Sequence, residues 1–195
     1  NPILMVALYG VNSGKDGTAE TEFRKVITWK NADLPEYVEV VSDEAGLLRR
    51  MKEVILEFNA DILTGYFTDG FDFPYLQARA QKHQVRFDLG IDYSEIIVAQ
   101  GGFGDVQSKI KGYLHLDMLK FIRNIFGKDL DVESYSLDSV SRELLNHQKH
   151  KVDLDKLSHT WDNSPENLAE YCAYNLHDSF LAYKLCEKLL PDMIL

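Results

Sequence analysis

One stretch of the chain, residues 59–76, constrains the fold more than any other. It begins with a short apolar run at residues 62–66, bounded by polar residues, and this pattern predicts a buried β-strand. A turn signal follows at residues 68–70, and apolar side chains then recur at helical spacing, beginning with Phe73 and Leu76. A strand that leads directly into a helix is typical of an open α/β sheet, whose ligands bind beyond the carboxyl ends of its strands.

Asp72 stands just before this predicted helix and allows two interpretations. A carboxylate in this place often caps the helix, and Pro74 fits the first turn, where its missing N–H costs little. Alternatively, Asp72 is a ligand of a hard cation such as Mg²⁺, which prefers carboxylate oxygens. One carboxylate alone does not decide between the two.

A second carboxylate, Asp178, lies in the predicted C-terminal helix, four residues after Tyr174 and therefore on the same face. An acid within an apolar helical face is costly to bury unless it pairs or binds a cation, although at the edge of that face it stays partly solvated. Taken together, Asp72 and Asp178 favour a divalent-metal site. The Tyr174 phenol would there orient a water molecule for attack at phosphorus.

Length and composition narrow the class of protein. The 195 residues suffice for one sizeable core, and we expect a single domain; an apolar content of 45% and a charged content of 27% are typical of globular proteins. No apolar run approaches the roughly 20 residues that cross a bilayer, and the N-terminus shows no signal-peptide pattern. Cys172 and Cys186 fall in one predicted helix, about 21 Å apart and too far to bridge. We therefore expect an intracellular, cytoplasmic protein.

The net charge of −10 argues against a stand-alone nucleic-acid binder, because such proteins neutralise phosphates with Lys and Arg. It does not argue against an active site that binds the end of a nucleic acid through metal ions while other domains provide most of the binding affinity.

The order of the predicted elements indicates the fold class. Strands are expected at residues 3–9, 24–29 and 37–41, the first two as a hairpin with a long connection. Ser42 is expected to cap a helix over residues 43–58. Further helices are expected over residues 117–126, from Ser136 onward, and from Ser164-Pro165 to about residue 190. Strands, then strand–helix alternation, then helices predict an α/β fold with a mixed sheet between helices.

Two segments give weaker signals. Residues 96–98 and 113–116 are strand-like, and the glycine-rich residues 101–105 between them indicate a turn, so we expect two extended arms and a projecting β-hairpin. Residues 147–156 are polar and contain two histidines. Because other metal-binding neighbours are lacking there, we interpret this segment as a solvated loop rather than a metal site.

Residues 66–76, with the sequence YFTDGFDFPYL, resemble the second exonuclease motif of family B DNA polymerases, the archaeal type especially. Tyr174 and Asp178, separated by three residues, resemble the third motif of that family. Four other segments follow the family in order and spacing: residues 25–30, 34–42, 111–117 and 135–140. The resemblance extends over nearly the whole chain.

This resemblance implies an RNase H-like fold and 3′→5′ proofreading of DNA with two divalent metals, Mg²⁺ or Mn²⁺. It implies that Asp72 and Asp178 bind metal and act in catalysis with Tyr174. It also implies that Tyr66, Phe67 and Phe71 contact DNA. The expected partners are the single-stranded 3′ end of DNA and the remaining domains of the same polymerase, and no membrane. The hairpin around residues 101–105 would help to apportion the primer end between polymerase and exonuclease sites.

The chain departs from the family in two respects. The Asp-x-Glu of the first motif is absent, and residues 3–9 resemble the strand that follows it, so we interpret the chain as starting downstream of that motif; the rival interpretation is that the acids have decayed to Tyr9 and Val11. Phe67 stands where the family usually has Asn. We therefore expect an incomplete metal site and little or no hydrolysis by this chain alone. The alternatives are a non-catalytic exonuclease-like module of an inactivated paralogue and, more distantly, a free-standing RNA-processing exonuclease.

Overall fold

The computed structural model describes residues 1–13, 19–100, 106–147 and 152–194. The chain forms two compact units, the first from residues 1–51 and 150–180 and the second from residues 52–149 and 181–195. Two helices, α1 (Glu44–Phe58) and α6 (Leu168–Ile194), contribute residues to both units. The single domain expected from the sequence stays a prediction.

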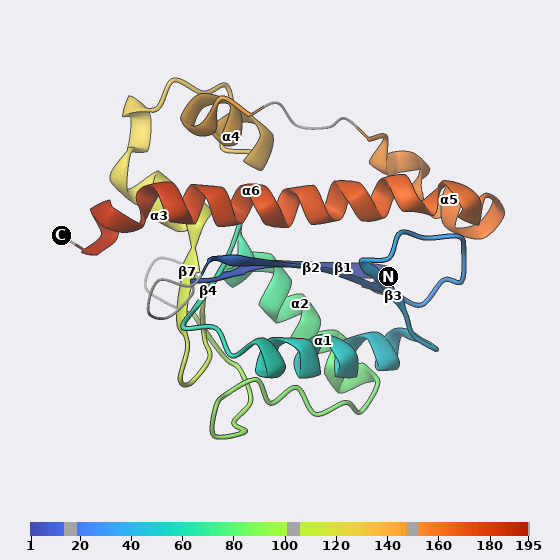
Figure 1. Ribbon diagram of the computed structural model, residues 1–195. Helices are drawn as coiled ribbons and strands as arrows, with labels where there is room; N and C mark the ends of the chain where they lie inside the picture. The colour runs from blue at the N-terminus through green and yellow to red at the C-terminus, as the bar shows by residue number, and fades with distance from the viewer. Residues whose placement is uncertain (14–18, 101–105, 148–151, 195) are drawn as a thin grey trace. The chain divides into compact units, whose positions relative to one another are not determined.

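A mixed three-stranded sheet lies at the centre of the first unit. β1 (Met5–Asn12) pairs antiparallel with β2 (Thr21–Thr28), which pairs in parallel with β3 (Val38–Val40), so that β1 is one edge of the sheet. Figure 1 shows this sheet nearly edge-on, with the first turns of α1 on one side and the first half of α6 on the other. The three strands and the α/β fold class predicted from the sequence are confirmed.

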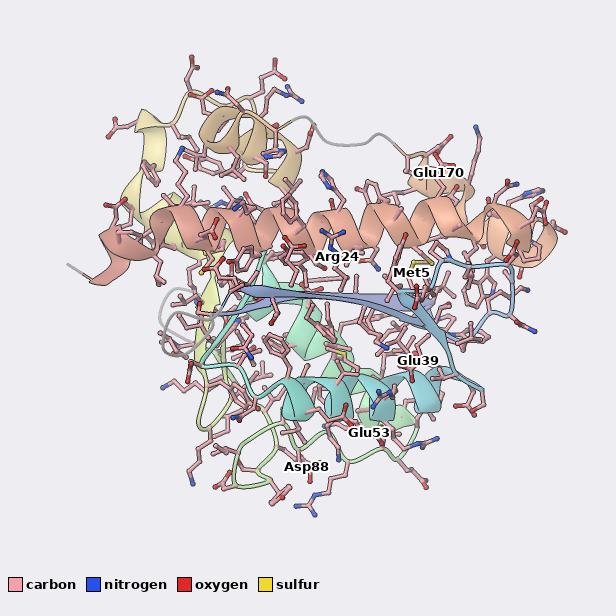
Figure 2. All side chains as sticks on the ribbon, in the orientation of Figure 1. Met5, Arg24, Glu39, Glu53, Asp88 and Glu170 are labelled. Atoms are coloured by element: carbon pink, nitrogen blue, oxygen red, sulfur yellow. The ribbon has the colours of Figure 1, made fainter. Side chains whose placement is uncertain are left out.

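Apolar contacts hold α6 to this sheet. Leu168 and Cys172 are fully buried on α6 and belong to one cluster with Val26 of β2. Trp161, on α5 (Leu157–Asn163), joins the same cluster, and its ring lies 4.6 Å from that of Trp29. At the edge of the unit, the Glu39 carboxylate, labelled in Figure 2, accepts hydrogen bonds from two basic side chains, Lys25 at 2.9 Å and Arg50 at 2.7 Å.

The cap expected for α1 was wrong by one residue. The sequence favoured Ser42, whereas the Asp43 carboxylate accepts a hydrogen bond from the Gly46 backbone N–H at 2.6 Å. A side-chain oxygen that reaches the amide three residues on is the usual capping geometry, which either residue type can provide. The apolar positions of the helix are as expected, with Leu47 and Leu48 fully buried.

The C-terminal region contains more elements than the single helix expected there. Short 3₁₀ turns, η5 (Leu154–Lys156) and η6 (Pro165–Asn167), flank α5, and α6 begins only at Leu168. Among the described residues, the Ser164 side chain makes no capping hydrogen bond, so the expected cap was wrong. The helix also continues through Pro191 to Ile194 instead of ending near residue 190. Both cysteines of α6 are buried and free in the described chain, which confirms that they form no disulfide.

The second unit contains two pairs of strands. β4 (Ile62–Gly65) pairs in parallel with β7 (Leu114–Asp117), and β5 (Ile97–Gln100) pairs antiparallel with β6 (Val106–Lys109). The second arm of the expected hairpin was therefore wrong, because β6 provides it and residues 114–117 pair with β4 instead. The sequence of β6 is mostly polar and gave no strand signal. The expected turn at residues 101–105 lies outside the described residues.

Helices enclose β4 and β7 within this unit. α3 (Met118–Ile125), α4 (Leu137–Leu145) and the last turns of α6 share one buried cluster, and the short 3₁₀ turn η4 (Gly127–Asp129) follows α3. The expected starts of both helices are confirmed, since Asp117 accepts from the Lys120 N–H and Ser136 from the Ser139 N–H.

Asp88, labelled in Figure 2, pairs with Lys52 at 2.7 Å. No helix within the described ranges is long and apolar enough to cross a membrane.

Candidate active site

A π-helical turn, η2 (Thr68–Asp72), joins β4 to α2 (Phe73–Lys82). The sequence predicted an ordinary turn at residues 68–70 and then a helix start at Asp72, whereas the chain is helical throughout. Asp72 has helical dihedral angles (φ −62°, ψ −52°), and its side chain makes no capping hydrogen bond to any described residue. The capping interpretation of Asp72 is therefore wrong, and its carboxylate is available for another role.

The surroundings of Asp72 suit a cation. Burial of the carboxyl group and, to a smaller extent, the neighbouring Asp117 carboxylate raise the pKa of Asp72 to about 6. Although the carboxyl group lies close to protein atoms, the residue as a whole is exposed, so that an ion from solvent can reach it. A bound divalent cation would offset the repulsion between the two carboxylates.

Asp117 holds the start of the π-helical turn. Its buried carboxylate accepts hydrogen bonds from the backbone N–H of Phe67 at 3.1 Å and of Asp69 at 2.9 Å, in addition to capping α3. The parallel register pairs Gly65 with Asp117, which brings this side chain beside the turn. Sequence reasoning identified Asp117 only as a helix start, because its second role depends on a strand pairing that local patterns do not reveal.

A buried polar cluster around Asp69 was also missed. Asp69 is bonded to Ser108 of β6 and to Lys120 of α3, and His115 of β7 lies against it. The sequence gave Asp69 only as part of a turn signal. The nearest of these partners is 39 residues away in the chain, so that no motif spacing connects them.

Exposed aromatic residues precede Asp72 in the chain. Phe67 and Phe71 are 48% and 57% exposed, and the Phe71 ring stacks on that of Tyr75 with centroids 5.5 Å apart. Rings with a free face are suited to stacking on unpaired bases. Tyr66 differs, because it packs against the core and its hydroxyl donates to the Tyr135 carbonyl at 2.8 Å. That these three residues contact DNA stays a prediction, and Tyr66 has a structural role in addition.

Phe67 adopts a left-handed backbone conformation, with φ 66° and ψ 25°. This conformation costs most residues about 1–2 kcal/mol, whereas Asn adopts it far more readily. The Asn that the family usually has at this position therefore also has a backbone reason, independent of its amide. Phe67 therefore occupies a position at which its backbone is strained.

Replacing Phe67 with Asn is expected to stabilise the fold. Relief of the left-handed strain is expected to add about 1 kcal/mol to the free energy of unfolding, which corresponds to about 2–4 °C in Tm for a chain of this size. Thermal unfolding followed by circular dichroism measures the shift. Phe71→Asn is the matched control, since Phe71 is exposed but lies within the right-handed π-helical turn. An equal Tm change in both variants would contradict the strain at residue 67.

Tyr174 and Asp178 lie one turn apart on α6 and are both half-buried. The next two residues attach this part of α6 to β1: the Ser179 hydroxyl donates to the Ala7 carbonyl at 3.1 Å, and the Phe180 ring meets that of Tyr9 at 5.2 Å. These two candidates belong to the first unit and Asp72 to the second. Their approach to one metal ion therefore stays a prediction. In the described part of the chain, no three His, Cys, Asp or Glu side chains gather as a metal site.

Comparison with known proteins identifies the family. The family model for the exonuclease domain of DNA polymerase family B matches residues 1–140. The DNA polymerase of Pyrococcus horikoshii is 36% identical over 173 residues, which are 89% of this chain and 13% of that protein. The DNA polymerase of Thermococcus kodakarensis is 34% identical over 190 residues, 97% of this chain and 10% of that protein. DNA polymerase 1 of Pyrococcus abyssi is 34% identical over 173 residues, with 22% of its length covered.

The chain thus spans from about a tenth to about a fifth of the length of these relatives. Within that span the similarity includes β4, η2 and α2, whose turn carries Asp72. Because the family model covers 140 of the 195 residues, the chain belongs to the exonuclease domains of family B DNA polymerases.

Proposed function

We propose that this chain is the 3′→5′ proofreading exonuclease domain of an archaeal-type DNA polymerase and acts on the single-stranded 3′ end of DNA. The observation that carries the proposal is the position of Asp72, an exposed carboxylate that does not cap its helix among the described residues, beside exposed Phe67 and Phe71. Such a site can hold a terminal phosphate through a cation while its aromatic rings stack on the terminal bases. The family membership supports the same activity.

Three residues of the chain have separate roles in the proposed site. Asp72 and Asp178 would hold the divalent metal, and the Tyr174 phenol would orient the attacking water. Mg²⁺ or Mn²⁺, when bound, supplies activation of water and charge stabilisation at phosphorus. No Asp-x-Glu precedes the second motif within these 195 residues, so we expect the chain alone to have little or no hydrolytic activity. The other domains of the same polymerase would be its natural partners.

A binding experiment tests this function without requiring turnover. A fluorescent single-stranded oligonucleotide is titrated with the 195-residue chain in Mn²⁺, with anisotropy as the readout. Phe71→Ala is expected to weaken binding by about 5- to 100-fold, since stacking on an aromatic side chain contributes about 1–3 kcal/mol per base. Tyr93→Ala is the control, because Tyr93 is also an exposed aromatic residue of the second unit but lies outside residues 66–76.

One result would contradict the proposed function, and a second would contradict the expected inactivity of the chain alone. Equal losses in Phe71→Ala and Tyr93→Ala, with binding that ignores Mn²⁺, would favour a non-catalytic exonuclease-like module. Phe67, in place of the Asn that the resemblance implies, and the net charge of −10 are the observations that favour that alternative. Digestion of the oligonucleotide by the chain, abolished by Asp72→Ala, would instead show that the site is complete without the first motif.

Metal binding is expected to depend on pH with a midpoint near 6. The pKa of Asp72 is raised from its ordinary value of 3.8 to about 6, so protons compete with the metal below pH 6 and not above pH 7. We expect the Mn²⁺ dissociation constant to be about tenfold higher at pH 5 than at pH 7. Electron paramagnetic resonance of free Mn²⁺ measures it. A midpoint near pH 4 would show that the Asp72 carboxyl group is not perturbed.

A further inference from the structure

The backbone of the π-helical turn sets the direction of Asp72. The Asp72 side chain makes no capping hydrogen bond among the described residues, and its position follows the backbone of the turn, of which it is the last residue. Backbone bonds close the wide turn, among them those from the Phe71 N–H to the Phe67 carbonyl and from the Phe73 N–H to the Thr68 carbonyl. Side-chain contacts from outside the turn add to these bonds.

Asp69 makes such contacts from the middle of the turn. Its side chain is only 8% exposed, and one oxygen accepts the Ser108 backbone N–H of β6 at 2.6 Å. The other oxygen accepts from the Lys120 ammonium group at 3.0 Å, and the same ammonium group donates to the Val106 carbonyl at 2.9 Å. One carboxylate thus joins the turn to both a strand of the β5–β6 hairpin and helix α3.

His115 closes the cluster from β7. Its Nδ1 lies 3.2 Å from the Ser108 carbonyl and 3.4 Å from the Asp69 carboxylate, both acceptors, so this nitrogen carries a proton. Its Nε2 lies 2.9 Å from the Thr68 hydroxyl, and the Phe73 ring meets the imidazole edge-on at 4.9 Å. The imidazole therefore contacts the residues at both ends of the π-helical turn as well as β6.

We propose that Asp69, with Lys120 and His115, is a positioning residue that ties the metal-binding carboxylate of Asp72 to the β5–β6 hairpin. Movement of the hairpin is transmitted through the Ser108 and Val106 backbone to Asp69, three residues before Asp72. The inference rests on the proposed function of Asp72 as a metal ligand. It adds that the hairpin and the metal site are one mechanical unit, in which neither end moves independently.

Lys120→Met tests this coupling. Removing the ammonium group takes away the ion pair that the buried Asp69 carboxylate makes with Lys120, so the turn and the hairpin are expected to loosen together. Amide hydrogen exchange, followed by mass spectrometry, is expected to become at least tenfold faster both at residues 67–73 and at residues 106–109. Lys111→Met is the matched control, since Lys111 is exposed on the same unit and pairs only with exposed Asp92 among the described ion pairs. Its exchange at both segments is expected to match that of the unmodified chain.

A double variant separates coupling from general destabilisation. If Lys120 acts through Asp69, then Asp69→Asn/Lys120→Met, which removes both charges, is expected to exchange no faster at residues 67–73 than Lys120→Met alone. Additive acceleration in the double variant would overturn the proposal. If Lys120→Met fails to fold, Thr68→Val serves instead, because it removes only the hydroxyl that contacts His115; acceleration at residues 106–109 is then expected as well, and its absence overturns the proposal.

Mn²⁺ affinity gives the functional readout. In Lys120→Met it is expected to fall at least fivefold, and in Lys111→Met to stay unchanged. An unchanged affinity in Lys120→Met, together with faster exchange confined to the hairpin, would overturn the inference while leaving the proposed function intact. If the unmodified chain binds no Mn²⁺, the proposed function is wrong, and the exchange data alone decide whether Asp69 couples turn and hairpin.

Discussion

Asp72→Asn is expected to weaken Mn²⁺ binding by at least about 100-fold while leaving the fold intact. The substitution keeps the size of the side chain and removes its charge, and hard divalent cations depend on carboxylate oxygens for affinity. Removal of a residue that only supports a ligand already costs about 10–100-fold, so loss of the ligand itself should cost at least as much. Isothermal titration with Mn²⁺ measures the change. Asp61→Asn is the control, because Asp61 is an exposed carboxylate just before β4.

The thermal stability of Asp72→Asn provides a second readout, which is not expected to fall together with the Mn²⁺ affinity. The pKa of Asp72 in the folded chain is about 6, above the ordinary value of 3.8, so the folded state binds a proton more tightly than the unfolded state. The contribution of the Asp72 carboxyl group to the free energy of unfolding is therefore greatest below about pH 4 and is lost as pH rises through about 6. At pH 7.5, Asp72→Asn removes this unfavourable charge, and its Tm is expected to equal or exceed that of the unmodified chain. A lower Tm, with Mn²⁺ affinity unchanged, would assign Asp72 a structural role.

Trp161→Ala is expected to destabilise the first unit by about 3–5 kcal/mol. Trp161 is 6% exposed, packs with Val26, Leu168 and Cys172, and contacts the Trp29 ring edge-on. Truncation of a large buried aromatic side chain leaves a cavity that the surrounding residues fill only in part. At about 2–4 °C per kcal/mol for a chain of this size, Tm should fall by about 10 °C.

The chain contains only two tryptophans, and both lie in the first unit, so the fluorescence of the remaining Trp29 reports on that unit during guanidinium unfolding. His159→Ala is the matched control on α5, because His159 is exposed. A loss below 1 kcal/mol for Trp161→Ala would mean that α5 does not cover this part of the core.

Local patterns predicted the elements that depend on short-range physics. The apolar spacing of α1 and the helix starts at Asp117 and Ser136 follow from rules that act within a few residues, and the structure confirms them. The strand pairing of residues 114–117 was wrong because pairing is decided between distant segments. The mostly polar β6 gave no strand signal, because apolar residues do not alternate along it. Its Ser108 N–H instead donates a hydrogen bond to the buried Asp69 carboxylate.

The candidate site was predicted only in part, for the same reason. Asp72, Tyr174 and Asp178 are identified by residue type and spacing, and the family membership supports the motif that contains Asp72. The hydrogen bonds that Asp117 accepts from the start of η2, and the cluster around Asp69, form only once β4 and β7 are paired. The Asp69 carboxylate meets Ser108, His115 and Lys120, which are all at least 39 residues away in the chain, so no linear pattern can reveal it.

The geometry of the η2 turn has a consequence for insertions and deletions. A π-helical turn holds one residue more than an α-helical turn, and such turns are often found at functional sites. A chain shortened by one residue between Thr68 and Asp72 could close this segment as a regular α-helical turn, but it would then lose the wide turn that carries Asp72. Among related sequences, the length of this segment should consequently be held constant even where its individual residues vary.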